Sequence, residues 1–295
     1  GLSEYATRVL LEAGLGAGIV KLKDGCYSNT KTAWFLLHDA VTRANLDFTQ
    51  DVNYLGLDRL ERALETGKPE GLKVFGDWPT LYRALAHFPP KVRESWLAFD
   101  HYYSDAAFPD ALKIVFADSP KQLLDIGGNT GKWALQCLRN DPDVRVTLLD
   151  LPGQLKMAQR TLTEAGMIGR AAFHEGDLLD PSSPIPGGFS AIWMSQFLDC
   201  FSEAQIVSIL KRCRAALGIA GKIYILEPFW DRQKYDAGAF SLQMTSLYFT
   251  AMANGNSRMY ETGRFLELVT EAGLAVAAQH DHLGTGHTLL VCKAA

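Results

Sequence analysis

The stretch Asp125-Ile126-Gly127-Gly128-Asn129-Thr130-Gly131 decides the fold of this chain. It lies between a buried-strand pattern at residues 123–126 and a helical pattern that runs through Trp133. Glycines at such a junction let the backbone turn tightly and approach a ligand without a clash from Cβ. The first turn of the following helix can receive the polar end of that ligand. The stretch therefore predicts a nucleotide-type binding site.

Strands and helices alternate from this turn toward the end of the chain. Further strand patterns occupy residues 144–149, 171–173, 191–194 and 222–226. A capping box, Ser202-Glu203-Ala204-Gln205, opens one of the helices between them. Two more strand patterns flank a Gly-rich turn and predict a closing antiparallel pair, at 275–279 and 288–292. The order predicts an α/β fold, a doubly wound Rossmann-like sheet whose ligand lies outside the carboxyl ends of its strands.

Two acidic residues follow neighbouring strands, at the edge where a nucleotide would bind. Asp150 ends the second strand, and its carboxylate can accept both ribose hydroxyls. Asp177 follows the third strand and could accept the adenine amino group. Surface acids beside an ordinary strand–helix turn are the alternative. The dinucleotide fingerprint G-x-G-x-x-G fails, because Asn129 and Lys132 replace two of its glycines, so a pyrophosphate pocket is not supported.

The composition excludes several other classes of protein. The 295 residues include 29 basic and 33 acidic side chains, a net charge of −4, which argues against a nucleic-acid partner. The five cysteines are scattered without a C-x-x-C pair, so neither a disulfide scaffold nor a zinc finger is expected. No apolar run approaches the ~18 residues of a membrane span. We expect a reduced, cytoplasmic protein with no membrane partner.

The first 90 residues differ in character from the rest. A helical pattern near residues 3–20 precedes two short alternating segments around Asp24-Gly25, a strong hairpin signal. A helix, a glycine break and a hairpin are typical of the second half of a winged helix. Two more helical patterns, at 54–66 and 80–86, end before Pro89-Pro90, a plausible boundary. We therefore expect a winged-helix-like domain at 1–90 and a ligand-binding domain at 91–295.

The winged shape raises the alternative of DNA binding. Residues 1–50 contain five basic and five acidic side chains, so this element has no electrostatic footprint for phosphate. The other interpretation is a packing or dimerisation module. The chain also opens on Gly1 without Met and in mid-pattern, from which we expect a missing piece upstream.

Four segments in this order resemble a known family: 125–131, Leu149-Asp150-Leu151-Pro152, Gly176-Asp177-Leu178-Leu179 and Leu226-Glu227-Pro228. They resemble the plant-caffeate-type and bacterial small-molecule O-methyltransferases, over essentially the whole chain. Those proteins carry an N-terminal winged-helix dimerisation domain and a sheet that binds S-adenosylmethionine. The resemblance implies a homodimer, S-adenosylmethionine as cofactor with S-adenosylhomocysteine as product, and a small-molecule acceptor.

The resemblance also assigns parts of the cofactor to residues. Gly127 and Gly128 would lie along its methionine part, Asp150 would bind the ribose, and Asp177 with Leu178 would hold the adenine. Asn129 departs from the glycine that is usual in the family, but Asn adopts unusual backbone angles more easily than most residues. The expected cofactor-binding set is Asp125, Gly127, Gly128, Asn129, Gly131, Asp150, Leu151, Asp177, Leu178, Met194 and Ser195.

The resemblance fails at the methyl-transfer site. In the family, a histidine after the fourth strand, within a Leu-His-Asp-Trp-like segment, deprotonates the acceptor hydroxyl. An alignment anchored on Asp199 and Glu203 places Leu198 at that position, and a leucine accepts no proton. A family acid that steadies the histidine is matched by Glu227, whereas a second, expected near residues 254–259, has no counterpart. The substitute bases to consider are Asp199, His101 and Glu227.

Three functions therefore stay open. The chain methylates a hydroxyl with another base or on an acidic acceptor, it methylates carbon or nitrogen, or it binds the cofactor without turnover as a winged-helix regulator. An aromatic and Met-rich lining would suit a flat apolar acceptor. The expected acceptor-site residues, on the fourth strand and on the helix after the fifth, are Trp193, Gln196, Phe240, Met244, Tyr248 and Met252.

The histidines near the C-terminus suggest a metal site only at first sight. His280 and His282 could share one face of a strand, with His287 close by. No carboxylate or cysteine is clearly placed to complete such a site, and the Gly-rich turn explains the polarity. We expect no metal.

Overall fold

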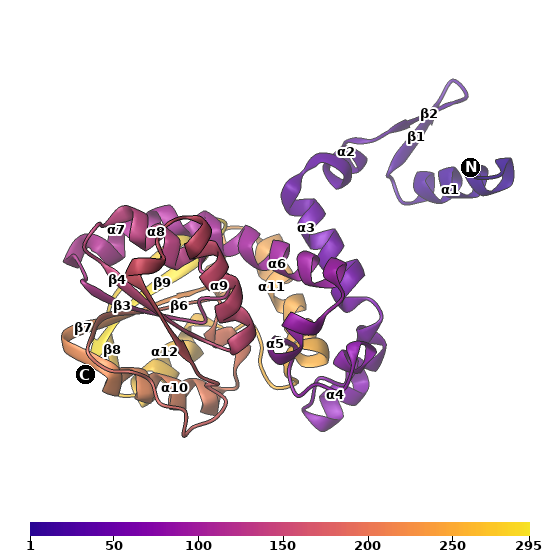
Figure 1. Cartoon of the computed structure of the whole chain (residues 1–295). Helices are drawn as coiled ribbons and strands as arrows, with labels where there is room; N and C mark the ends of the chain where they lie inside the picture. Colours follow the sequence, from indigo (N-terminus) through magenta and orange to yellow (C-terminus); the bar gives the residue numbers. More distant parts are fainter.

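The computed structural model describes residues 1–295, and Figure 1 shows an α/β body from which the N-terminal elements project. The projecting part, here called the N-terminal arm (residues 1–38), contains four elements: α1 (Glu4–Gly16), β1 (Val20–Lys23), β2 (Cys26–Asn29) and α2 (Lys31–His38). Asp24 and Gly25 join the two strands with φ angles of 51° and 75°, the left-handed pair that an Asp-Gly hairpin turn favours. The predicted helix and hairpin are confirmed.

The N-terminal arm is largely solvent-exposed along this chain. Neither α1 nor the hairpin contains a buried residue, although α1 carries several apolar side chains. Tyr5, Val9 and Leu10 are 78%, 44% and 60% exposed, and Trp34 of α2 is 53% exposed. Isolated apolar side chains are ordinary on a surface, but here several lie together on one projecting arm.

Short helical elements connect the arm to the body. They are α3 (Ala40–Phe48), the π-turn η1 (Thr49–Asn53), the 3₁₀ turns η2 (Gly56–Arg59), η3 (Glu70–Phe75) and η4 (Leu85–His87), and the helices α4 (Leu60–Thr66) and α5 (Leu81–Ala84). The prediction of one helix over 54–66 is wrong in its first half. There the chain forms the 3₁₀ turn η2, and Gly56 packs so closely that a Cβ would lie 2.0 Å from the sulfur of Met252. A long helix, α6 (Pro90–Ser104), begins at the predicted boundary.

The sheet of the body has seven strands in the order β5-β4-β3-β6-β7-β9-β8. The first five run parallel, and β9 pairs antiparallel with both β7 and β8. Their bounds are β3 (Gln122–Ile126), β4 (Arg145–Asp150), β5 (Ala171–Glu175), β6 (Phe189–Ser195), β7 (Leu217–Glu227), β8 (Leu274–Leu283) and β9 (His287–Ala294). The predicted doubly wound sheet and its closing antiparallel pair are confirmed.

Helices cover both faces of this sheet (Figure 1). One core packs β3, β4 and β6 against α7 (Phe108–Val115), α8 (Lys132–Asn140) and α9 (Pro152–Glu164). The other packs the opposite face against α10 (Glu203–Ala216) and α12 (Thr262–Glu271). Ser202 and Gln205 form the predicted capping box at the start of α10. The parallel strands are buried on both sides, as a sheet between two helical layers requires.

A third core connects the N-terminal helices with the C-terminal part of the chain. It packs Phe48, Leu72, Leu85 and Trp96 against side chains of α11 (Asp236–Tyr248) and of the π-turn η10 (Phe249–Ala253) that continues it. The Trp96 indole nitrogen donates a hydrogen bond of 2.8 Å to the Tyr248 hydroxyl inside this core. We call it the joining core. It fixes the N-terminal helices over the edge of the sheet where the ligand is expected.

Candidate functional site

A cavity lies at the carboxyl ends of β3, β4 and β6, and α5, α6 and α11 contribute to its walls. Aromatic rings form much of the lining, and four carboxylates face it as well: Asp100, Asp150, Asp177 and Asp199. The cavity has the position predicted for the ligand of a doubly wound sheet.

The Gly-rich turn after β3 forms one wall of this cavity. Gly127 has a φ of 71°, and a Cβ there would lie 2.3 Å from the Phe197 ring, so only glycine fits. Asn129 also has a positive φ, 48°, which Asn tolerates better than most side chains. Gly127 and Asn129 line the cavity, whereas Gly128 and Gly131 support the turn from behind.

Asp150, at the end of β4, is the central polar residue of the site. Its Oδ2 accepts a hydrogen bond of 2.9 Å from the Asn129 backbone, and its Oδ1 accepts one of 2.7 Å from the Leu151 backbone. Burial raises the pKa of Asp150 to about 6. Beneath the turn, burial raises the pKa of Asp125 to about 8, and one of its oxygens is buried without a partner. Asp125 therefore supports the turn from the interior and does not line the cavity.

The residues after β5 form the far end of the cavity. Asp177 Oδ1 accepts a hydrogen bond of 3.0 Å from the Leu179 backbone, and Leu178 lies beside it in the wall. Arg83 of α5 reaches across and forms an ion pair with Asp177. This pair ties the N-terminal helices to the edge of the sheet.

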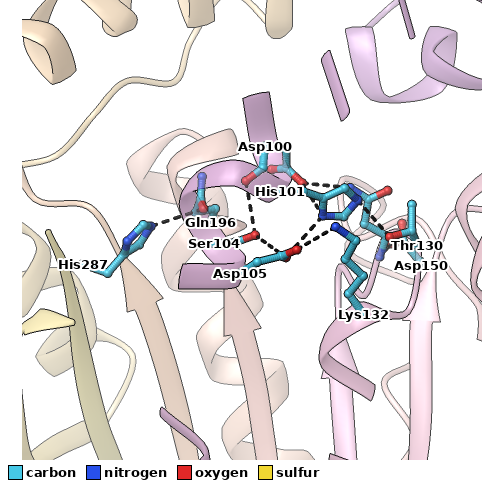
Figure 2. A network of polar contacts seen from close by, with 10 residues as sticks. Asp100, His101, Ser104, Asp105, Thr130, Lys132, Asp150, Gln196 and His287 are labelled. Atoms are coloured by element: carbon cyan, nitrogen blue, oxygen red, sulfur yellow. Dashed lines mark hydrogen bonds and ion pairs between the residues drawn. The ribbon is translucent and has the colours of Figure 1, made fainter. Parts of the chain in front are cut away.

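Helix α6 adds a polar network that the sequence did not predict (Figure 2). Asp100 accepts a hydrogen bond of 3.0 Å from the Asn129 side chain, and burial raises the pKa of Asp100. His101 lies 2.9 Å from the Thr130 hydroxyl and 3.6 Å from Asp105. Figure 2 shows these side chains converging on the Gly-rich turn from above. His101 therefore buttresses the turn, and it does not belong to the cavity lining.

The segment after β6 contains Leu198 and Asp199, and Glu227 at the end of β7 lies against it. Glu227 Oε1 accepts hydrogen bonds of 3.0 and 2.8 Å from the Phe197 and Leu198 backbones, and these bonds fix the segment after β6 to the end of β7. Leu198 is fully buried in the core and faces no cavity. Asp199 lines the cavity, and burial raises its pKa. Of the three bases considered, Asp199, His101 and Glu227, only Asp199 forms part of the wall.

The structure separates the six acceptor-site residues expected from the sequence. Gln196 and Tyr248 line the cavity, as does the cofactor-site residue Ser195. The placement of Trp193 in the site is wrong, because its ring stacks on Trp133 in the interior at 3.9 Å between centroids. The placement of Met252 in the site is also wrong, because Met252 is buried in the joining core against Gly56 and Gly71. Met194 is likewise buried in the core, and Phe240 and Met244 are exposed outside the lining.

Several lining residues were not predicted at all. Among them are Tyr82, Arg83, Trp96, Phe99, Asp100 and Phe197. Five of these belong to the N-terminal helices, whose position over the sheet depends on the joining core and not on a local motif. Of these residues, only Phe197 had a signal in the sequence: the glycine at 127 indicated that some group packs closely against the turn, without identifying which one.

The histidines near the C-terminus do not form a cluster. No group of three or more His, Cys, Asp or Glu side chains in residues 1–295 is arranged to hold a metal ion. The strand pairing is irregular between His280 and Leu283, and His282 has a φ of 62°, so the expected alternation along the strand is broken.

None of the helices in this structure combines the length and the apolar character that a membrane span requires.

A carboxylate-lined cavity against a Gly-rich turn, at the carboxyl ends of a doubly wound sheet, defines a nucleotide-binding α/β protein. A family model described as an O-methyltransferase domain matches residues 88–275. The chain belongs to this family of S-adenosylmethionine-dependent small-molecule O-methyltransferases. The enzyme class, fold and cofactor expected from the resemblance are thereby confirmed.

Individual relatives share less than a third of their residues with this chain. L-tyrosine C(3)-methyltransferase of Streptomyces lavendulae is 23% identical over 277 residues, 92% of this chain and 74% of the relative. A 2,7-dihydroxy-5-methyl-1-naphthoate 7-O-methyltransferase of Streptomyces carzinostaticus is 28% identical over 251 residues, 85% and 68% of the two chains. The O-methyltransferase NcsB1 from neocarzinostatin biosynthesis, solved with S-adenosylmethionine and 2-hydroxy-5-methyl naphthoic acid, is 24% identical. It superposes with a TM-score of 0.78 over 100% of this chain and 86% of its own.

The residues present fit S-adenosylmethionine. Gly127 and Asp150 line the cavity together, one after β3 and the other at the acidic end of β4. The Asn129 Oδ1 and the Ser195 hydroxyl are buried without a partner in the protein, so a ligand has hydrogen bonds to complete there. The carboxylates in the lining also outnumber the single arginine, which favours a ligand with positive charge.

Proposed function

We propose that this protein methylates a hydroxyl group on a small aromatic molecule. The observation that carries the proposal is one continuous cavity, with a Gly-rich turn and Asp150 at one end and aromatic side chains at the other. Trp96, Phe99 and Tyr248 offer flat apolar walls of the kind that suits an aromatic ring. The relatives named for naphthoate substrates support an acceptor of this class.

S-adenosylmethionine, when bound, supplies an electrophilic methyl group on a positively charged sulfur. In our proposal Asp150 holds the ribose. Each of its carboxylate oxygens accepts one backbone hydrogen bond, from Asn129 or Leu151, and each has a further lone pair that can accept from a ribose hydroxyl. Asp177 and Leu178 hold the adenine. Gly127, Asn129 and Ser195 lie along the methionine part. These residues bind and orient the cofactor, so that its methyl group lies within reach of the acceptor; they take no chemical part in the transfer.

We assign the role of the base to Asp199. In our proposal Leu198 stands at the position of the family histidine, and its hydrocarbon side chain, buried in the core, takes no part in proton transfer. Asp199 follows it directly and reaches the wall, where burial raises the pKa of its carboxyl and makes the carboxylate a stronger proton acceptor. It would take the proton of the acceptor hydroxyl, so that the oxygen carries negative charge as the methyl is transferred. Glu227 acts as a positioning residue for this segment through its two backbone hydrogen bonds.

Methylation of a ring carbon is the second candidate. The relative from Streptomyces lavendulae is named for methylation of a carbon atom of tyrosine, and it aligns with 92% of this chain. Deprotonating a phenol also activates the neighbouring ring carbon, so the same base would serve. The atom that receives the methyl then depends on how the ring is held.

We also propose a homodimer that forms through the N-terminal arm, and a division of the chain near residue 90. The exposed apolar side chains of α1 and α2 support the dimer, because a second chain would cover them.

Incubation with S-adenosylmethionine and a panel of phenols and hydroxynaphthoates tests the function. We expect S-adenosylhomocysteine and a methylated product, and a carbon-13 methyl donor distinguishes methyl on oxygen from methyl on carbon by NMR shift. Calorimetry with S-adenosylmethionine and with NADH is run alongside. Heat of binding with NADH but none with S-adenosylmethionine would contradict the proposal.

A further inference from the structure

A second cavity adjoins the first and is built differently. The two share four lining residues, Phe99, Gln196, Thr245 and Met259, so they meet at that boundary. The second cavity lies between α11, the turn before β9, and side chains of α3 and α6. Its lining includes Asn45, Tyr103, Gln233, Ser241 and His287, and no Asp, Glu, Lys or Arg. It therefore offers polar but no charged side chains among apolar ones, in contrast to the first cavity with its four carboxylates.

Gln196 stands at the boundary in an unusual conformation. Its φ is 45°, a left-handed angle that is uncommon outside glycine and that concentrates at functional positions. Its side-chain oxygen lies 3.2 Å from His287 Nε2, and Figure 2 shows the two side chains pointing toward each other. An amide oxygen can only accept, so the His287 Nε2 carries the hydrogen. The amide nitrogen of Gln196 is then left to donate toward the cavities that the residue lines.

His287 has an unsatisfied atom at this place. The residue is 1% exposed, and its Nδ1 is buried without a hydrogen-bond partner. Because Nε2 bears the hydrogen, Nδ1 presents a lone pair and can only accept. Burial lowers the pKa of His287 to about 4, so the ring is neutral at physiological pH. The protein therefore supplies no donor to this buried acceptor.

We propose that the second cavity holds the far end of the methyl acceptor, and that His287 and Gln196 select an uncharged polar substituent there. The substituent donates to His287 Nδ1 and accepts from the Gln196 amide, as a carboxamide does. A carboxylate is rejected, because it has no hydrogen to donate and meets no positive side chain in this lining. A purely apolar substituent leaves both protein groups unpaired, which weakens its binding. The inference rests on the proposed function only in taking the ligand to be a methyl acceptor.

Three catechols that differ in one substituent test the proposal: 3,4-dihydroxybenzamide, 3,4-dihydroxybenzoate and 4-methylcatechol. Their dissociation constants are measured by calorimetry on the full chain saturated with S-adenosylhomocysteine. We expect the carboxamide to bind about 10- to 100-fold more tightly than 4-methylcatechol, and the carboxylate to bind most weakly. Equal affinities within about twofold, tightest binding of the carboxylate, or no binding of the carboxamide at about 10 mM would overturn the inference.

Variants of His287 assign the preference to its side chain. His287→Phe removes both nitrogens and is expected to abolish the preference for the carboxamide, whereas His287→Asn keeps a polar atom near Nδ1 and should restore part of it. Affinity for S-adenosylhomocysteine reports whether each variant is folded, and the exposed His282→Phe is the matched control. A carboxamide preference that survives in His287→Phe would contradict the assignment.

The two proposals fail in different ways. If the catechols are methylated with no regard to the third substituent, the proposed function stands and this inference falls. If the carboxamide binds with the expected preference but accepts no methyl from S-adenosylmethionine, the selection by His287 and Gln196 stands and the proposed methylation falls.

Discussion

Replacing Asp150 by Asn tests the centre of the cofactor site. Both carboxylate oxygens of Asp150 are already acceptors, at 2.9 Å for the Asn129 backbone and 2.7 Å for the Leu151 backbone. Asparagine has one oxygen, so its NH₂ group must face one of these N–H donors. The variant therefore loses one backbone hydrogen bond and displaces the side chain that would hold the ribose.

The size of the effect follows from these contacts. The displaced side chain loses its hydrogen bond to the ribose. A hydrogen bond to a charged group contributes about 1.5–3 kcal/mol, which corresponds to a loss of about 10- to 150-fold in affinity for S-adenosylmethionine. The pKa of Asp150 is raised by burial to about 6, above its ordinary value of 3.8, so the folded protein protonates this group as the pH falls through 6. The ionised fraction drops from roughly nine-tenths at pH 7 to one-tenth at pH 5. Wild-type affinity should fall about tenfold over that range from this group alone.

Calorimetry at pH 5, 6 and 7 on the wild type and Asp150→Asn measures both effects. Glu175→Gln is the matched control, because Glu175 pairs with Asp150 in register at the same edge of the sheet but does not line the cavity. We expect Asp150→Asn to be weak at pH 7 and to lose the part of the pH dependence that Asp150 supplies. An Asp150→Asn protein that binds as tightly as Glu175→Gln, with the wild-type pH dependence, would refute the assignment of Asp150 to the ribose.

Three further changes test other parts of the molecule. Asp199→Asn should lower kcat by about 10²- to 10⁴-fold with little change in S-adenosylmethionine affinity, since it removes a general base, and unchanged turnover would exclude Asp199 from that role. Asp125→Asn should raise the melting temperature by a few degrees at pH 8 and much less at pH 5. The pKa of Asp125 is raised to about 8, so the stability that its protonated form supplies is present at low pH and lost as the pH rises toward 8; equal shifts at both pH values would contradict this. The double change Tyr5→Lys and Val9→Lys on α1 should halve the molar mass measured by light scattering if the N-terminal arm forms the dimer, whereas a wild-type mass would argue for another interface.

The sequence predicted those parts of the structure that depend on local patterns. The strand before Gly127, the capping box at Ser202 and the hairpin at Asp24 each carry their signal within a few residues, and all three are present. The position of Asp150 followed from the parallel order of the strands. Periodicity alone sufficed for the sheet because its strands alternate with helices of ordinary length.

The errors have physical causes that no local pattern carries. Trp193 lies on a strand that is buried on both faces, so alternation could not reveal which way its side chain points. Met244, Tyr248 and Met252 share a face only if the helix continues regularly, but the π-turn at Phe249–Ala253 changes the phase, and Met252 enters the core. Arg83 and Asp100 approach the cofactor site only through tertiary packing of the N-terminal helices, more than 20 residues before the Gly-rich turn.

The joining core limits how this enzyme could be recombined with its relatives. A chimera that takes only the first 90 residues from another family member would replace the residues that Tyr248 and Met252 contact, among them Phe48 and Gly56, which precede them by about 200 residues. The imported helices would then meet a surface shaped for different side chains. The N-terminal helices and residues 236–259 therefore have to be exchanged together, while the strands of the sheet, with Gln196 and His287 beside them, stay in place. The part of the cavity wall that these two segments build is one packing unit, although its two pieces lie far apart in the sequence.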